Sequence, residues 1–285
     1  MLDIVKDTLF DAIKLLPFLF ITYLLMEYLE HKTGDKTKNI VEKSGKLGPL
    51  FGGVLGIFPQ CGFSAAAANL YSGKIVTLGT LIAVFLSTSD EMLPILISEA
   101  APINLIIKIL LIKLALGILF GFIIDAIYGV ITNRKKQEDA KEAIAHMCDH
   151  EHCDCDHEGI IKSSIKHTLN ILLFIIVITF IINVLIHFIG EEKIANAIAS
   201  VPIVGVLISG LFGLIPNCAG SVIITELYLS KLITFGSMIA GLLVGSGIGL
   251  LVLFKSNKNI KENLKITLLL YLIGIISGIV IDLII

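Results

Sequence analysis

Residues 56–64 read GIFPQCGFS and residues 213–221 read GLIPNCAGS, so the same glycine, proline, cysteine and serine recur 157 positions apart. The stretch from Gly48 to Glu91 superimposes on Gly205 to Ile248 at this offset without a gap. Further identical pairs are Tyr71 and Tyr228, Lys74 and Lys231, Thr77 and Thr234, Gly79 and Gly236, Ser89 and Ser246, and Asp125 and Asp282. Such an internal repeat predicts a protein made of two copies of one structural unit.

The composition predicts a protein that lives in a membrane. Of the 285 residues 55% are hydrophobic, the mean hydropathy is +0.92, and several apolar runs reach about 20 residues, enough to cross a bilayer as a helix. We therefore expect an all-α polytopic membrane protein. The first apolar run, Thr8 to Glu30, is too long for a signal-peptide core and is expected to be a retained helix. A net charge of -2 gives no support for nucleic-acid binding, and no Gly-Lys-Ser/Thr phosphate loop is present.

The segment around Pro59 consists of two short apolar pieces, residues 47–58 and 63–71, on either side of a break. At 1.5 Å per residue, each piece extends about 15 Å, roughly half of a 30 Å hydrocarbon core. One kinked crossing helix and a re-entrant hairpin both fit these lengths. We favour the hairpin, because it places the basic loops 31–46, 132–166 and 255–265 on one face, as the positive-inside rule requires. The central loop is then cytoplasmic and both termini lie outside.

If the segment around Pro59 is a re-entrant hairpin, each unit has three full spans. Because three is an odd number, the second copy is inserted upside down relative to the first. We expect two inverted-topology repeats of five segments each, residues 1–131 and 165–285, joined by a linker at 132–164. Inverted repeats with interrupted helices are a common construction of secondary transporters, with the site where the interruptions meet. A plain proline kink without a site is the alternative.

Polar side chains cluster at both interruptions. Asp90 and Glu91 follow three hydroxyl residues inside a segment that we expect to cross the membrane, where a buried acid costs about 2.5–3.5 kcal/mol and usually faces a partner or a pathway. Alternatively, the two acids are solvated at the end of a tilted helix. Asp90 aligns with Gly247, so the acid is present in one half alone. The candidate residues of the ion pathway are Pro59, Gln60, Cys61, Ser64, Asn69, Ser87, Thr88, Ser89, Asp90, Glu91, Pro216, Asn217, Cys218, Ser221, Glu226 and Ser246.

Cys61 and Cys218 occupy equivalent positions after the two prolines. As thiols they are suitable ligands for a soft cation or a trivalent metalloid, but buried cysteine is also a common inert apolar residue. A thiol redox pair would instead make the protein a membrane oxidoreductase. Neither cysteine belongs to a Cys-x-x-Cys pair, which argues against that activity.

The last helix of each unit combines small residues with isolated charges. Gly-x-x-x-Gly pairs, Gly117 with Gly121 and Gly274 with Gly278, predict close helix packing within a subunit or in a homo-oligomer. Lys108 and Lys113 are expected to snorkel to the interface or to pair with acids.

The linker contains three of the five cysteines and four of the seven histidines within twelve residues. Imidazole and thiolate with interleaved carboxylates predict a metal-binding tract for ions such as zinc, nickel, cobalt or copper. We interpret it as a cytoplasmic collector or sensor with reduced thiols, against adventitious binding. Its candidate ligands are His146, Cys148, His150, His152, Cys153, Cys155 and His157.

The chain resembles a family of heavy-metal exporters. The resemblance is carried by the residues Gly56 to Ser64, Gly79 to Phe85 and Thr88 to Glu91, by the matching second half and by the His/Cys-rich linker. Members of that family are often labelled arsenic efflux proteins or manganese transporters, and are described as having ten membrane segments. The resemblance implies export of metal or metalloid ions across the cytoplasmic membrane, with the bilayer and the ions as partners and no required cofactor. A metal-gated channel remains an alternative, and the transported ion and the coupling gradient stay open.

Overall fold

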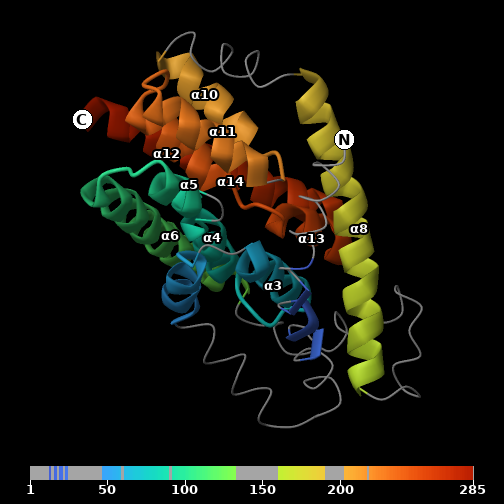
Figure 1. The fold of residues 1–285 in the computed structure, drawn as a ribbon. Coiled ribbons are helices and arrows are strands. Elements are labelled where there is room, and N and C mark those ends of the chain that lie inside the picture. The colour runs from blue at the N-terminus through green and yellow to red at the C-terminus, as the bar shows by residue number, and fades with distance from the viewer. Residues whose placement is uncertain are drawn as a thin grey trace.

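The computed structural model describes residues 47–58, 61–89, 92–132, 160–189, 202–216 and 218–284, and in the first helix residues 13, 16, 17, 19–21, 23 and 24. Every regular element in these ranges is a helix, which confirms the all-α class (Figure 1). The helices are Leu47–Gly56, α3 (Cys61–Ser72), α4 (Leu78–Ser87), α5 (Met92–Ser98), α6 (Ile103–Thr132), α8 (Ile160–Ile189), α10 (Pro202–Gly213), α11 (Cys218–Leu229), α12 (Phe235–Val244), α13 (Gly249–Ser256) and α14 (Ile260–Ile284).

The repeat recognised in the sequence is present helix by helix. The helices α3, α4, α5 and α6 each begin 157 residues before α11, α12, α13 and α14. The turns between them also match, because Lys74 and Lys231 both have a φ of 59°, an unusual left-handed conformation for a residue other than glycine. The chain therefore consists of two copies of one helical unit.

Five helical segments of the described chain are long and apolar enough to cross a membrane: Leu78–Ser98, Ile103–Ile127, Ser164–Ile181, Phe235–Ser256 and Ile260–Ile284. This finding confirms a polytopic membrane protein. Other helices are too short to cross, among them the apolar helices Leu47–Gly56, Val204–Gly213 and Gly220–Leu229, and α3 with 12 residues. Their lengths agree with the predicted arms of the two hairpins.

Two of the five spans are interrupted in the middle, which the sequence analysis did not predict. The first is interrupted between α4 and α5, where Thr88 and Ser89 are not helical, and the hydroxyl of Thr88 bonds back to the Val84 carbonyl at 2.7 Å. Such back-bonding offers the chain an alternative to a continuous helix. The second is interrupted between α12 and α13, where Gly247 has a φ of 54° that glycine adopts without strain.

Close helix packing holds each unit together, as the glycine pairs predicted. A Cβ atom on Gly121 of α6 would lie 2.8 Å from the carbonyl oxygen of Gly79 in α4. In the second unit a Cβ on Gly278 of α14 would lie 2.6 Å from the carbonyl of Gly236 in α12. Only glycine permits these approaches. The other members of the pairs approach backbone atoms in the same way: Gly117 and Gly274.

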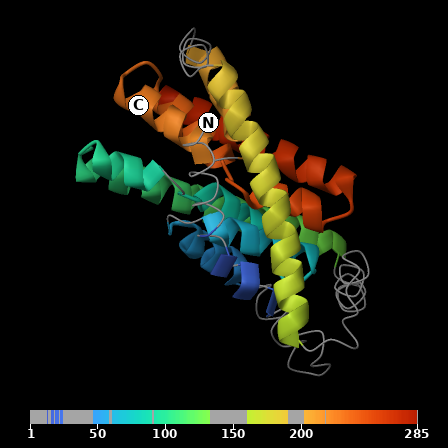
Figure 2. The same ribbon diagram turned by 45° about the vertical axis from the view of Figure 1, so that its right-hand side comes forward.

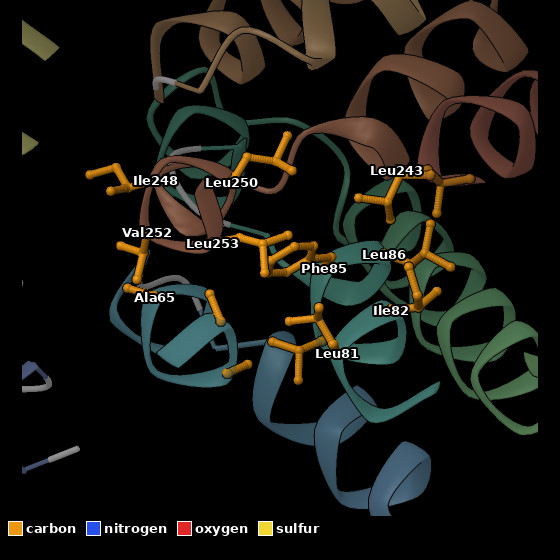
Figure 3. Close-up of a cluster of buried hydrophobic side chains, with 14 of the residues drawn as sticks. Ala65, Leu81, Ile82, Phe85, Leu86, Leu243, Ile248, Leu250, Val252 and Leu253 are labelled. Atoms are coloured by element: carbon orange, nitrogen blue, oxygen red, sulfur yellow. The ribbon is translucent and has the colours of Figure 1, made fainter. Parts of the chain in front are cut away.

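Helices of the first unit pack against helices of the second. The helix α13 of the second unit packs on α3 of the first, and α5 of the first unit contacts α11 of the second, while α4 contacts α12. Phe85 of α4 is fully buried where α3, α4 and α13 meet (Figure 3). The long helix α8 lies along one side of the molecule beside α13 (Figures 1 and 2).

Candidate functional site

A polar cavity lies where the interrupted helices of the two units meet. The cavity is small: its volume for a water-sized molecule is about 10 Å³, room for about one water. The first unit supplies residues from the α4–α5 interruption and from α6, and the second supplies the end of α10, the start of α11 and the α12–α13 interruption. The lining residues are Thr88, Ser89, Met92 and Lys113, and Gly213, Gly220, Ser221, Leu242, Gly245 and Gly247.

Ser89 connects the two interruptions of the first unit. Its hydroxyl donates a hydrogen bond to the carbonyl of Ile57, which lies just beyond the helix Leu47–Gly56. A carbonyl released at a helix end has no partner of its own, and inside a membrane such groups must be satisfied by protein or by a water-filled cavity. The bond therefore ties the end of the helix Leu47–Gly56 to the cavity wall.

Lys113 supplies a buried amino group to the cavity wall. Its side chain is 1% exposed, and its ammonium donates a hydrogen bond to the carbonyl of Leu242 in the last turn of α12. A cation at a helix C-terminus interacts favourably with the helix dipole. The bond also joins α6 of the first unit to α12 of the second. Snorkelling of Lys113 to the interface is excluded because its side chain ends inside the bundle, whereas pairing with an acid, the other expectation, stays a prediction.

The sequence analysis did not place Lys113 in the site, although one signal pointed to it. The position matched to Lys113 in the second repeat is Leu270, which is fully buried. A charge present in only one of two otherwise similar apolar helices is therefore a marker of a function that the two halves do not share.

Ser246 is matched to Ser89, but its environment differs. The side chain is fully buried, and its hydroxyl oxygen has no hydrogen-bond partner among the described residues. A buried hydroxyl without a partner costs about 1–3 kcal/mol. An ion or a water molecule at this interruption would remove that cost.

The structure places three of the predicted pathway residues in the cavity wall, Thr88, Ser89 and Ser221. Ser64 and Ser87 are buried and do not line it, and each hydroxyl bonds to a carbonyl of its own helix, Cys61 at 2.8 Å and Ala83 at 2.7 Å. Two further residues mark helix ends and are half-buried: Cys61 at the start of α3 and Pro216 after α10.

Asn69 and Glu226, which are matched by the repeat, also lie outside the cavity wall. Asn69 is buried, and its side-chain oxygen accepts hydrogen bonds from Tyr23 at 3.3 Å and from Ser256 at 2.6 Å. Glu226 is exposed on α11. The two positions therefore have opposite environments in the two units.

Several predicted residues lie outside the described part of the chain. Asp90 and Glu91 belong to this group, and the residues on either side of them, Ser89 and Met92, both line the cavity. In the described ranges no three His, Cys, Asp or Glu side chains come together as a metal site. The remaining predicted residues outside the description are Pro59, Gln60, Asn217, the side chain of Cys218, and the linker residues His146, Cys148, His150, His152, Cys153, Cys155 and His157.

These features define a polytopic α-helical membrane protein of two repeated units with a polar cavity between them. The model of a family described as "Putative, 10TM heavy-metal exporter" matches residues 1–191 and 156–285, and the two matches together span the chain. The chain belongs to this family, as its motifs indicated, and the family description points to metal efflux. No curated protein and no solved structure matches the chain.

Proposed function

We propose that this protein is a secondary transporter that exports metal or metalloid ions, such as manganese or arsenite, across the cell membrane and is coupled to an ion gradient. The observation that carries the proposal is the polar cavity at the junction of the two repeats, where interrupted helices from both units end. Interrupted helices that meet at the centre of a repeat-built bundle are typical of transporter binding sites.

The proposed topology follows from charge and helix length. With the short helices as re-entrant arms, each unit has three full spans and the second unit is inverted. Lys255, Lys258, Lys261 and Lys265 then lie on the cytoplasmic side, together with the His/Cys-rich linker. Both termini lie outside, and the linker collects or senses metal ions before export.

The proposed ligands come from the interruptions. Hydroxyl and carbonyl oxygens around Thr88, Ser89 and Ser221, with the carboxylates of Asp90 and Glu91, are suited to a hard ion such as manganese. The thiols of Cys61 and Cys218 are suited to arsenite or another soft species. Whether the oxygen ligands or the thiols bind depends on the chemistry of the transported ion.

Uptake of a panel of ions into everted membrane vesicles tests the proposal. We expect ATP-independent accumulation of at least one of manganese, zinc, cobalt, nickel or arsenite, and its loss in Asp90→Asn. Cys61→Ser should lower transport only when the cargo is thiophilic. Ser98→Ala is a matched control, because this exposed hydroxyl bonds to its own helix at Ile95. Wild-type vesicles that accumulate none of these ions would contradict the proposal, and unchanged uptake by Asp90→Asn would remove Asp90 from the mechanism.

A further inference from the structure

We propose that the contact between α5 and α11 is the outer gate of the transporter, and that it closes only when a positive charge lies between Glu99 and Glu226. The proposal rests on the transport function proposed above. It is argued from the repeat, because the matched contact between α3 and α13 shows the same elements in a closed arrangement. We call these two contacts the α5–α11 interface and the α3–α13 interface.

The α3–α13 interface is closed at its cavity end by tight apolar packing. A Cβ atom on Gly249 would lie 2.8 Å from the Cβ of Ser64, so the two helices approach to backbone contact there. Further along α13, Leu250, Val252 and Leu253 are buried beside Ala65 of α3 and Phe85 of α4 (Figure 3). No cavity-lining residue comes from α3 or α13.

Polar bonds close the far end of the same interface. The hydroxyl of Ser256, the last residue of α13, donates to the Asn69 side-chain oxygen of α3 at 2.6 Å. Nearby, the Tyr71 hydroxyl donates to the carboxylate of Glu262 at the start of α14. Both bonds connect the first unit to the second, so this interface is joined along its whole length.

The α5–α11 interface is packed less closely in the same structure, although the two helices are in contact. Of the α5 residues only Met92 and Leu96 are buried, whereas the matched helix α13 buries four residues. The cavity extends to this side, since Met92 of α5 and Gly220 and Ser221 of α11 are part of its wall. The two matched interfaces are therefore packed to different extents, which is the kind of asymmetry that alternating access requires of inverted repeats.

The repeat identifies which residues meet when the α5–α11 interface closes. Glu99 is matched to Ser256 and Glu226 is matched to Asn69, each at the offset of 157. Both glutamates are exposed in this structure. In the closed arrangement of the other interface, they would replace a hydroxyl and an amide that are 2.6 Å apart.

Two carboxylates at hydrogen-bonding distance cannot both stay ionised without a counter-charge. A shared proton or a bridging metal cation supplies that charge, and either one converts repulsion into attraction. The α3–α13 interface needs neither, because its hydroxyl and amide are neutral. The two interfaces therefore differ in chemistry, although the repeat matches their helices one to one.

The other ionisable side chains described near the α5–α11 interface include two lysines. Lys108 of α6 lies over the ring of Phe235 at 4.7 Å, and that ring packs against Tyr228 of α11 at 5.7 Å. Lys231 follows α11, and the sequence of α12 contains no ionisable residue. Among the described residues of α5, α11 and the turns that follow them, Glu99 and Glu226 are the only carboxylates.

A double variant tests the gate, because Glu99→Ser with Glu226→Asn reproduces the neutral pair of the α3–α13 interface. Spin labels at Ile97 and Leu232, which are 62% and 51% exposed, report the separation of the two elements in the full chain in lipid nanodiscs, with the native cysteines replaced by serine. In the parent protein we expect acid to shift the population from the long to the short distance. In the double variant the short distance should dominate at acidic and alkaline pH alike.

Two experimental conditions distinguish the possible sources of the positive charge. Acidification without metal measures a shared proton, and manganese added at alkaline pH measures a bridging cation. Lys231→Gln is the control, since it changes a charge at the same end of α11 without touching the acidic pair. Distances in the double variant that match the parent protein in every condition would overturn the gate. Ion uptake by the parent protein is measured separately, so a failure of the transport function is distinguishable from a failure of the gate.

Discussion

The carboxylate of Asp125 accepts a hydrogen bond from the hydroxyl of Thr77 at 2.6 Å, and so ties the C-terminal part of α6 to the N-terminus of α4. Its other oxygen accepts from the amide of Gly79 at 2.9 Å. Asp282 makes the same pair of bonds, with Thr234 at 2.6 Å and with the Gly236 amide at 2.6 Å. An acid at a helix N-terminus satisfies an orphan amide and interacts favourably with the helix dipole.

Replacement of these acids should destabilise both units to a similar extent. We expect Asp125→Ala and Asp282→Ala each to lower the free energy of unfolding by about 1–3 kcal/mol, because each leaves a helix-end amide and a hydroxyl without their partner. Thr77→Ala should cost less, about 1 kcal/mol, since Asp125 still holds the Gly79 amide. Denaturant unfolding in detergent micelles measures these values. Acid variants within about 0.5 kcal/mol of the parent protein would contradict the assignment.

The glycine contacts between the helices make a second prediction about stability. Gly121→Ala and Gly278→Ala force a methyl group against a backbone carbonyl, which cannot move as a side chain does. Overpacking of this kind costs about 1–3 kcal/mol. Leu119→Ala on the same helix is the control, because Leu119 is 54% exposed on the outer surface of α6. Thermal unfolding in micelles should rank both glycine variants below the control, and the reverse order would show that α6 and α4 separate easily.

The repeat and the helices were predictable because they follow from local pattern. Apolar runs of membrane-spanning length indicate helices, and an exact offset of 157 residues places the second unit on the first. Asp125 and Asp282 also align at this offset, but their structural role was not predicted. The contact that explains them is with Thr77 and Thr234, 48 residues earlier in each case, and only tertiary packing brings those positions together.

The cavity was predicted in part. Proline and cysteine at matched positions indicated interruptions, and Thr88, Ser89 and Ser221 do line the cavity. Lys113 was missed, because a single lysine in an apolar helix fits snorkelling equally well until the packing of α6 on α12 is known. Asn69 bonds across the two units, a contact that was not predicted, because a buried amide gives no sequence signal for it.

Lys113 should be essential for transport in a way that a nearby lysine is not. A hydrogen bond to a charged group is worth about 1.5–3 kcal/mol, so its loss in Lys113→Met should weaken cargo transport by roughly 10- to 100-fold. Lys108→Met on the same helix is the matched control, because Lys108 contacts the ring of Phe235 outside the cavity wall. Initial uptake rates in everted vesicles measure both. Equal effects of the two variants would indicate that Lys113 contributes only general helix stability.

Ser89 and Ser246 are matched by the repeat, yet we expect their alanine variants to behave differently. Ser89→Ala removes the donor for the Ile57 carbonyl and should lower the free energy of unfolding by about 1–3 kcal/mol. Ser246→Ala removes a buried hydroxyl that has no partner among the described residues, so stability should stay the same or rise by about 1 kcal/mol. If that hydroxyl contacts the cargo, uptake by Ser246→Ala should nevertheless fall.

Parallel unfolding and uptake measurements separate the two roles of these serines. A stable Ser246→Ala protein with reduced uptake would assign the second interruption to cargo binding, because a loss of stability could not then explain the loss of transport. A destabilised Ser246→Ala protein would contradict the assignment, since it would mean that the hydroxyl has a structural partner equivalent to the Ile57 carbonyl. The matched carbonyl in the second repeat belongs to Leu214, which makes it the acceptor that such a result would identify.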